Sequence, residues 1–272
     1  MHERSAEFPD IHLEDFIASL TQSEKDNLCK ETFKKKHVHC IHTEGYKIHQ
    51  WQAYTCLYCE LNTSGNTYFL SSGNWYKVAG DFVAKVNQAY AGIPSYQRTL
   101  PKYKDDSESQ YNERIVREMA GQFALMDKKD IPHGGGQSKV EFCDLYSRDK
   151  DIIHVKRYGA SSVLSHLFSQ GSISGDLFQM DKEFREKVSQ KLPVGFKIIN
   201  CEERPRNNEY QIVYAIISDV PGELDIPYFS RLNLKNSART ISGLGYRVAK
   251  LKIDVDPVKA KLRKYRIKKK AQ

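Results

Sequence analysis

The sequence lacks any long apolar run. No stretch approaches the about 20 apolar residues that a membrane-spanning helix needs, and the first ten residues, MHERSAEFPD, lack the apolar core of a signal peptide. We therefore expect a cytoplasmic protein with no membrane partner. A hydrophobic content of 40% and a charged content of 28% are typical of a globular chain that buries a substantial core.

The six cysteines lack the regular spacing of a disulfide framework. One cluster of metal-binding residue types occurs in HVHCIH, residues 37–42, followed by a CxxC pair at Cys56 and Cys59. Such a cluster could bind structural zinc. However, the run YTCLYCELN alternates like a strand, which would place the two cysteines on opposite faces. We therefore do not expect zinc.

The body of the chain also lacks an excess of charge. Residues 257–272 hold eight Lys/Arg and no acid, and the remaining 34 basic and 34 acidic residues balance. The net charge of +8 therefore belongs to the tail, whose lysines could bind nucleic-acid phosphates and release counterions. A solvated tail that favours solubility explains the same composition. The tail residues expected to contact nucleic acid are Lys264, Lys268, Lys269 and Lys270.

Two common catalytic motifs are missing. The glycines at 134–136 precede a strand pattern rather than a helix, and no P-loop lysine follows, so we interpret them as a tight turn. No GxSxG elbow occurs, which disfavours a serine nucleophile activated by histidine.

The hydrophobic patterns predict a mixed α/β fold. Residues 13–30 suit an amphipathic helix, and the runs WQAYTCLYCELN, NTYFLSS and NWYKVAG predict a small antiparallel β-meander. The later run QIVYAII is typical of a central strand. We expect a helix and meander over residues 1–106, a central mixed sheet with flanking helices over residues 107–256, and a basic tail over residues 257–272.

Two adjacent strand patterns carry polar residues that strand packing does not explain. The run VEFCDLY includes Asp144, and the run IIHVK places His154 and Lys156 on one face. A connecting turn with an odd number of residues, or a bulge, would set Asp144 opposite His154. An acid, an imidazole and an ammonium group would then converge.

This strand pair resembles the core of the PD-(D/E)xK nuclease superfamily, in which an acid on one strand is followed by acid-x-lysine on the next. The matching residues are Asp144, His154 and Lys156, and histidine in place of the second acid is a departure. The pair is most similar to Mrr-type restriction endonucleases, whose lysine tends to be followed by an Arg-Tyr like Arg157-Tyr158. The resemblance implies a restriction-endonuclease-like fold and a metal-dependent DNA endonuclease that serves restriction or anti-phage defence.

The resemblance also implies roles for single residues. Magnesium or manganese would be held by Asp144, with Glu113 and His154 as further ligands, and Lys156 would offset charge that develops during the reaction. Glu113 is the candidate acid of the preceding helix because it shares the face expected to meet the sheet. Its place in the first helical turn, where an acid complements the helix dipole, explains it equally well.

The resemblance extends to partners. Arg157 and the hydroxyls of Ser161 and Ser162, at the start of the next helix, could hold a DNA phosphate, although capping also explains the serines. A homodimer would suit double-strand cleavage. Segments such as YNE, HVKRYG, LSHLFSQG and PYFSRLNLKNSAR are similar to an uncharacterised, sporadically distributed bacterial family over residues 51–253, and since its other members are longer at the amino end we expect a short form or a fragment.

Two alternatives to an enzyme stay open. In the first, the chain is a catalytically inactive member of the nuclease fold that binds nucleic acid or a partner protein, and His154 is the reason for its inactivity. In the second, the chain is a structural module in which Asp144 and Lys156 form only a weak cross-strand ion pair.

Overall fold

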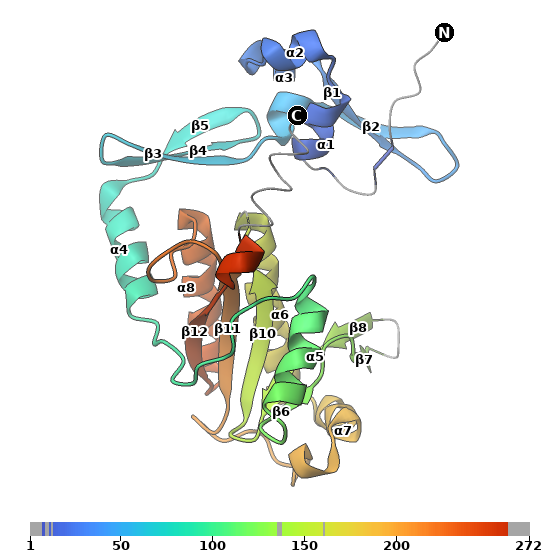
Figure 1. Ribbon diagram of the computed structural model, residues 1–272, viewed down its shortest axis with the longest axis vertical. Helices are drawn as coiled ribbons and strands as arrows, with labels where there is room; N and C mark the ends of the chain where they lie inside the picture. Colours follow the sequence, from blue (N-terminus) through green and yellow to red (C-terminus); the bar gives the residue numbers. More distant parts are fainter. Residues whose placement is uncertain (1–6, 9–10, 12, 135–137, 160, 261–272) are drawn as a thin grey trace. The chain divides into compact units, whose positions relative to one another are not determined.

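The computed structural model describes residues 7–8, 11, 13–134, 138–159 and 161–260 (Figure 1). The fold is mixed α/β, with a central mixed sheet, flanking helices and small antiparallel sheets, and this confirms the expected fold class. The chain forms two compact units, Met1–Val83 and Ala84–Gln272. Among the described residues, no helix is both long and apolar enough to cross a membrane.

The first unit consists of short elements. Its elements are α1 (Leu13–Ser19), α2 (Gln22–Asp26), α3 (Lys30–Lys35), β1 (His37–Ile41), β2 (Lys47–Gln52), η1 (Ala53–Cys56), β3 (Cys59–Thr63), β4 (Asn66–Ser71) and β5 (Asn74–Lys77). Strands β3, β4 and β5 form an antiparallel meander as predicted, and β1 pairs with β2. The first predicted run, WQAYTCLYCELN, is not one strand, because η1 interrupts it at Ala53–Cys56 and only its end forms β3. The single helix expected over residues 13–30 is broken, because the Thr21 hydroxyl accepts a bond from the Glu24 amide and caps a new helix there.

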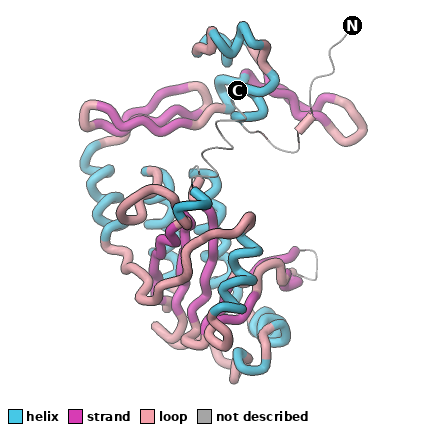
Figure 2. The backbone as a smooth tube through the Cα atoms, viewed as in Figure 1, coloured by secondary structure: helices cyan, strands magenta, loops and turns pink. Residues whose placement is uncertain are grey.

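The second unit is built on a five-stranded sheet. Its elements are α4 (Gly80–Ala91, which begins in the first unit), α5 (Glu108–Glu118), β6 (Phe123–Leu125), β7 (Asp130–His133), β8 (Ser138–Glu141), β9 (Leu145–Ser147), β10 (Asp151–Arg157), α6 (Ser161–Met180), α7 (Lys182–Lys191), η2 (Val194–Phe196), β11 (Gln211–Ser218), α8 (Tyr228–Gly243) and β12 (Arg247–Asp254). The strand order is β12-β11-β10-β9-β6 (Figures 1 and 2). Strands β10, β11 and β12 run parallel to one another. Strand β9 is antiparallel to both of its neighbours, β10 and β6. The run QIVYAII forms β11, which is central as predicted.

The two faces of this sheet bury different side chains, as the period of a strand requires. On β10, Ile152 packs in the cluster that includes residues of α6 and α8, whereas Ile153 and Val155 pack in the cluster that includes residues of α5. Strand β10 is therefore buried on both faces, which is typical of a parallel strand between layers of helices. Helix α5 covers one face, and α6 and α8 cover the other.

Two glycines let α6 approach β11 closely. A Cβ atom on Gly171 would lie 2.7 Å from Tyr214 Cε1, and one on Gly175 would lie 2.8 Å from Ile212 Cδ1. Real Cβ atoms do not come so near their neighbours, so the absence of a side chain fixes the helix-to-sheet distance. Helix α6 continues through both glycines and is 20 residues long.

The segment before α5 belongs to the second unit, whereas the sequence analysis placed residues up to 106 in an N-terminal region. Tyr96 and Tyr103 lie in the core cluster on the α5 face, and the Tyr96 hydroxyl donates to Asp151 Oδ2 at 2.7 Å. The polar run before α5 is held by Arg114, which is 5% exposed and donates to both carboxylate oxygens of Asp105. The polar run before α5, whose composition is typical of a linker, is therefore packed against the sheet and α5.

Candidate metal centre

Asp144 lies where the chain leaves one sheet and enters another. The sequence predicts one continuous strand here, but β8 pairs with β7 and ends at Glu141, and β9 begins at Leu145. The Asp144 amide donates to the Ile153 carbonyl at 3.0 Å. Its carboxylate Oδ2 accepts a bond from the Val155 amide at 2.6 Å, so the side chain takes the place of a ladder carbonyl.

A tight turn brings Asp127 beside it. The Met126 and Asp127 amides both donate to the Asp144 carbonyl, at 2.9 and 3.0 Å. Lys128 adopts a φ of 61°, and the Lys129 amide closes the turn on the Met126 carbonyl at 3.0 Å. This turn follows β6 directly, and it holds the Asp127 side chain next to the Asp144 side chain.

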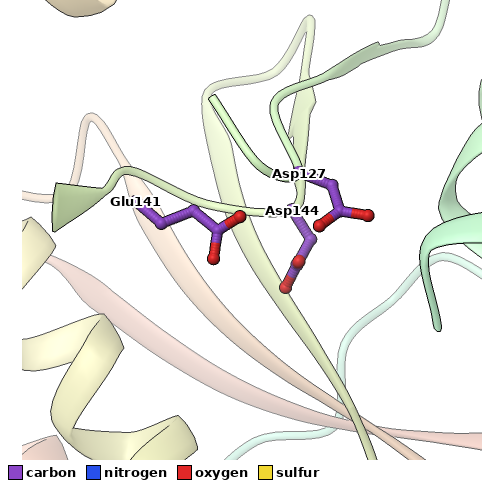
Figure 3. A group of neighbouring side chains, drawn as sticks. All are labelled: Asp127, Glu141 and Asp144. Carbon is purple, nitrogen blue, oxygen red and sulfur yellow. The ribbon is translucent and has the colours of Figure 1, made fainter. Parts of the chain in front are cut away.

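Glu141, the last residue of β8, completes a group of three carboxylates. One oxygen from each of Asp127, Glu141 and Asp144 can be chosen so that all lie within 4.8 Å of one another (Figure 3). The Lys128 amide donates to Glu141 Oε1, which holds that side chain against the turn. All three residues are partly buried. We call Asp127, Glu141 and Asp144 the acidic group.

The charges of the acidic group oppose one another. Burial raises the pKa of Asp144 well above its ordinary value, and the nearby Glu141 and Asp127 raise it further. Burial also raises the pKa of Glu141, against the bond from the Lys128 amide, and Asp127 and Asp130 add to the increase. Without a counter-ion, full ionisation of this group is therefore unfavourable.

A second polar side chain is aimed at the group from α5. Asn112 is fully buried, at 0% exposure, and its Nδ2 lies 3.5 Å from Asp144 Oδ1. Its Oδ1 is buried and has no hydrogen-bond partner within the described part of the chain. A buried amide oxygen without a donor is costly. A water molecule or an ion at this place would satisfy it.

The acid of α5 that meets the strands is Glu108, the first residue of the helix. Its Oε2 lies 3.1 Å from Lys156 Nζ, and its Oε1 accepts a bond from the Arg157 amide at 2.9 Å. Glu108 also raises the pKa of Asp144, so it lies close enough to add to the field of the acidic group. The charge of Lys156 in turn opposes the rise in the pKa of Glu141. The predicted lysine is thus at the site.

His154 is not part of this group, contrary to the expected convergence. Its side chain is 2% exposed, and its Nε2 lies 3.3 Å from Ser174 Oγ on α6. Burial lowers its pKa to about 4. The turn between β9 and β10 has the odd length required, three residues. However, the break in the strand at Asp144 turns its carboxylate away from the α6 face, where His154 packs.

The structure also corrects the orientation expected for Glu113. Its side chain is exposed, while its neighbours Asn112 and Arg114 are buried. The buried face of the helix includes Tyr111, Asn112 and Ile115, and Glu113 lies off this face. Glu108 went unrecognised because its run, KYKDDSES, has the composition of a linker. The Ser107 N-cap, which accepts a bond from the Gln110 amide, was the available signal.

The other predicted binding residues fall in three settings. Arg157 stacks over the Tyr103 ring at 5.4 Å, beside Lys156. Ser161 is buried, with its hydroxyl accepting from Ser230 at 3.3 Å, whereas Ser162 is exposed. Packing therefore accounts for the first serine. The remaining candidates lie outside the described residues, and they are Lys264, Lys268, Lys269 and Lys270.

The donor set of the acidic group favours a hard cation. The three carboxylates supply oxygen ligands, which suit magnesium, manganese or calcium better than zinc. The fold and this group define a mixed α/β protein with a candidate divalent-cation centre next to its central sheet. The chain belongs to the DUF6119 family, a family of unknown function whose model matches residues 1–254. Comparison with curated proteins and with solved structures gives no match.

Proposed function

We propose that this protein is a metal-dependent phosphodiesterase that acts on nucleic acid, with Asp127, Glu141 and Asp144 as ligands of magnesium or manganese. The observation that carries the proposal is the acidic group itself, three neighbouring carboxylates, with the buried Asn112 amide in contact with Asp144. A cation would offset the repulsion between the three carboxylates. Two of these ligands, Asp127 and Glu141, replace His154 and Glu113 of the expected set.

A bound cation would act as a Lewis acid toward a phosphate oxygen and lower the pKa of a coordinated water. Lys156 would then stabilise the negative charge that develops on the phosphate. In the present structure Glu108 holds Lys156 at 3.1 Å and is itself fixed by the Arg157 amide. We assign Glu108 the positioning of the Lys156 ammonium, whereas the acid expected on this helix, Glu113, was a metal ligand.

Two features support DNA as the substrate. The resemblance of Asp144, Lys156 and Arg157-Tyr158 to Mrr-type restriction endonucleases implies a DNA endonuclease in restriction or defence. The guanidinium of Arg157, stacked on Tyr103, lies next in sequence to Lys156 and could bind a backbone phosphate near the acidic group. A homodimer would allow such an enzyme to cut both strands.

The second candidate function is an inactive member of the same fold that binds nucleic acid or a partner. It is favoured by His154, which stands where the nuclease pattern has its second acid and which is buried in the core. In this case the acidic group would bind a cation for structure, and Lys156 would serve only its ion pair with Glu108. The two candidates differ in catalysis rather than in fold.

The test is cleavage of supercoiled plasmid DNA in magnesium or manganese. We expect wild-type protein to nick the plasmid, and Asp144→Ala and Lys156→Ala to lose the activity. Lys139→Ala, a change at an exposed lysine of β8, is the matched control and should behave like wild type. Absence of cleavage of plasmid, linear DNA and RNA in every metal would reject the enzyme in favour of the inactive candidate.

A further inference from the structure

A cavity of about 300 Å³ lies in the second unit, at the end of the sheet where β10 and β11 begin. Lys150, just before β10, and Tyr210, just before β11, both line it. Asp144 instead contacts Val155, in the second half of β10. The cavity and the acidic group therefore adjoin different parts of the same strand, and the proposed nuclease chemistry does not use the cavity.

The lining of this cavity is strongly basic. Six basic side chains stand against two acidic ones, Glu203 and Glu209. This local excess is notable because residues 1–256 carry equal numbers of basic and acidic residues. The six basic side chains are Arg148, Lys150, Arg185, Lys197, Arg204 and Arg206.

The two acids neutralise only part of this charge. Glu209 pairs with Lys150 at 2.5 Å, and Glu203 pairs with Arg206 at 3.5 Å. Arg148 and Lys197 are bound by backbone carbonyls, which orient a cation but do not cancel its charge. The cavity therefore keeps an excess of positive charge.

Arg185 contributes most to the argument because it is buried. It is 3% exposed, and it donates to the carbonyls of Cys201, Phe178 and Gln179 at 2.9 to 3.1 Å. Within the described ranges no carboxylate is paired with it. A buried cation without an anion is unfavourable, and an anionic ligand in the cavity would supply the missing charge.

The shape and the donor types favour one class of anion. Arginine forks match phosphate oxygens, and four of the six cations are arginines. Aromatic side chains complete the walls, and the volume is that of a small-molecule site. We propose that this cavity binds a phosphorylated small molecule. The aromatic lining residues are Tyr146, Phe178, Phe196 and Tyr210.

The experiment is calorimetric titration of the full chain with inorganic pyrophosphate and with adenosine monophosphate, in buffer freed of divalent cations. The test variant is Arg204→Glu with Arg206→Glu, because both side chains are exposed and neither holds a carbonyl in place. The matched control is Arg239→Glu, an exposed arginine of α8 outside the cavity. Circular dichroism checks that each variant is folded.

We expect saturable binding of at least one probe by wild-type protein, a loss of at least tenfold in the double variant, and no change in the control. Asp144→Asn should bind the probe like wild type, which separates this cavity from the acidic group. Equal binding by the double variant and wild type, or no saturable binding of either probe, would overturn the proposal. A single-stranded oligonucleotide that binds wild-type protein but not the double variant, while neither small probe binds, would also overturn the proposal. The ligand would then be a nucleic-acid strand.

Discussion

Two buried polar pockets lie on opposite faces of β10, one around Asp144 and one around His154. On the α6 face, His154 is neutral and contacts the Ser174 hydroxyl at 3.3 Å. On the α5 face, Asp144 lies among like charges, and the side-chain oxygen of Asn112, whose Nδ2 contacts Asp144, has no partner within the described part of the chain. The first pocket is satisfied by the protein alone. The second is not.

This difference separates a structural polar group from a candidate functional one. Burial shifts both titratable groups toward their neutral forms, lowering the pKa of His154 and raising that of Asp144. Only the acid also faces other acids. A pocket that stabilises the fold has no reason to gather three carboxylates. We therefore expect substitutions in the two pockets to have opposite consequences for stability and for activity.

The largest effect is expected for Asp144→Asn. The amide keeps an acceptor for the Val155 amide but loses a charged ligand, so we expect plasmid cleavage to fall about a thousandfold. In the presence of a metal chelator, the same change removes the repulsion between Asp144 and the carboxylates of Asp127 and Glu141. It should then raise the free energy of unfolding by about 1 kcal/mol. Nicking assays and urea denaturation measure the two quantities. Retention of cleavage within tenfold of wild type would break the comparison.

The next effect is the pH dependence of stability from His154. Its pKa is about 4 in the folded protein against an ordinary value of 6.5, so the unfolded chain binds the proton first. The contribution to stability is complete above pH 6.5 and is lost as the pH falls toward 4, by about 3 kcal/mol. Urea denaturation across this range should show the loss. In His154→Gln the total loss of stability between pH 6.5 and 4 should be smaller by this amount, and an unchanged loss would contradict the assignment.

A smaller effect on stability is expected for His154→Ala. Deleting the buried ring leaves a cavity between β10 and α6, which should lower the free energy of unfolding by about 2 kcal/mol. Cleavage per folded molecule should stay within about threefold of wild type, because His154 does not touch the acidic group. A loss of cleavage comparable to that of Asp144→Asn would show that the two pockets act together.

The smallest predicted effect distinguishes two acids on α5. Glu108→Gln weakens the hold on Lys156, so we expect a decrease in cleavage of about tenfold with little change in metal affinity. Glu113→Gln, one turn further along the same helix and exposed, should leave cleavage unchanged. Nicking rates over a manganese titration give both values. Equal rates for the two variants would remove Glu108 from the proposed site.

The sequence was sufficient to predict the central sheet and the meander because their signals are local. The apolar run of β11 required burial on both faces, the period of two marked β10 as a strand, and Asn/Ser/Gly turns marked the ends of β3, β4 and β5. The run FKIINC, residues 196–201, in contrast, has the composition of a strand, but only Phe196 lies in a regular element, the end of η2, and residues 197–201 are irregular. Ile199 within it is 98% exposed, so no core holds it extended.

The candidate site was predictable only in part. Asp144 and Lys156 could be found because they interrupt apolar strands. Asp127 and Glu141 could not, because their approach depends on the break after β8 and on the positive φ of Lys128, and neither has a sequence period. Strand alternation predicted that His154 and Asp144 converge, and the same break is the reason that they do not.

The most direct test of the account is calorimetric titration with manganese of wild-type protein, Asp144→Asn and His154→Ala. The account predicts saturable binding by wild type, binding of similar affinity by His154→Ala, and a loss of at least tenfold in affinity for Asp144→Asn. Absence of manganese binding to wild type, or equal binding by Asp144→Asn, would contradict the claim that the α5 face of β10 carries a cation site.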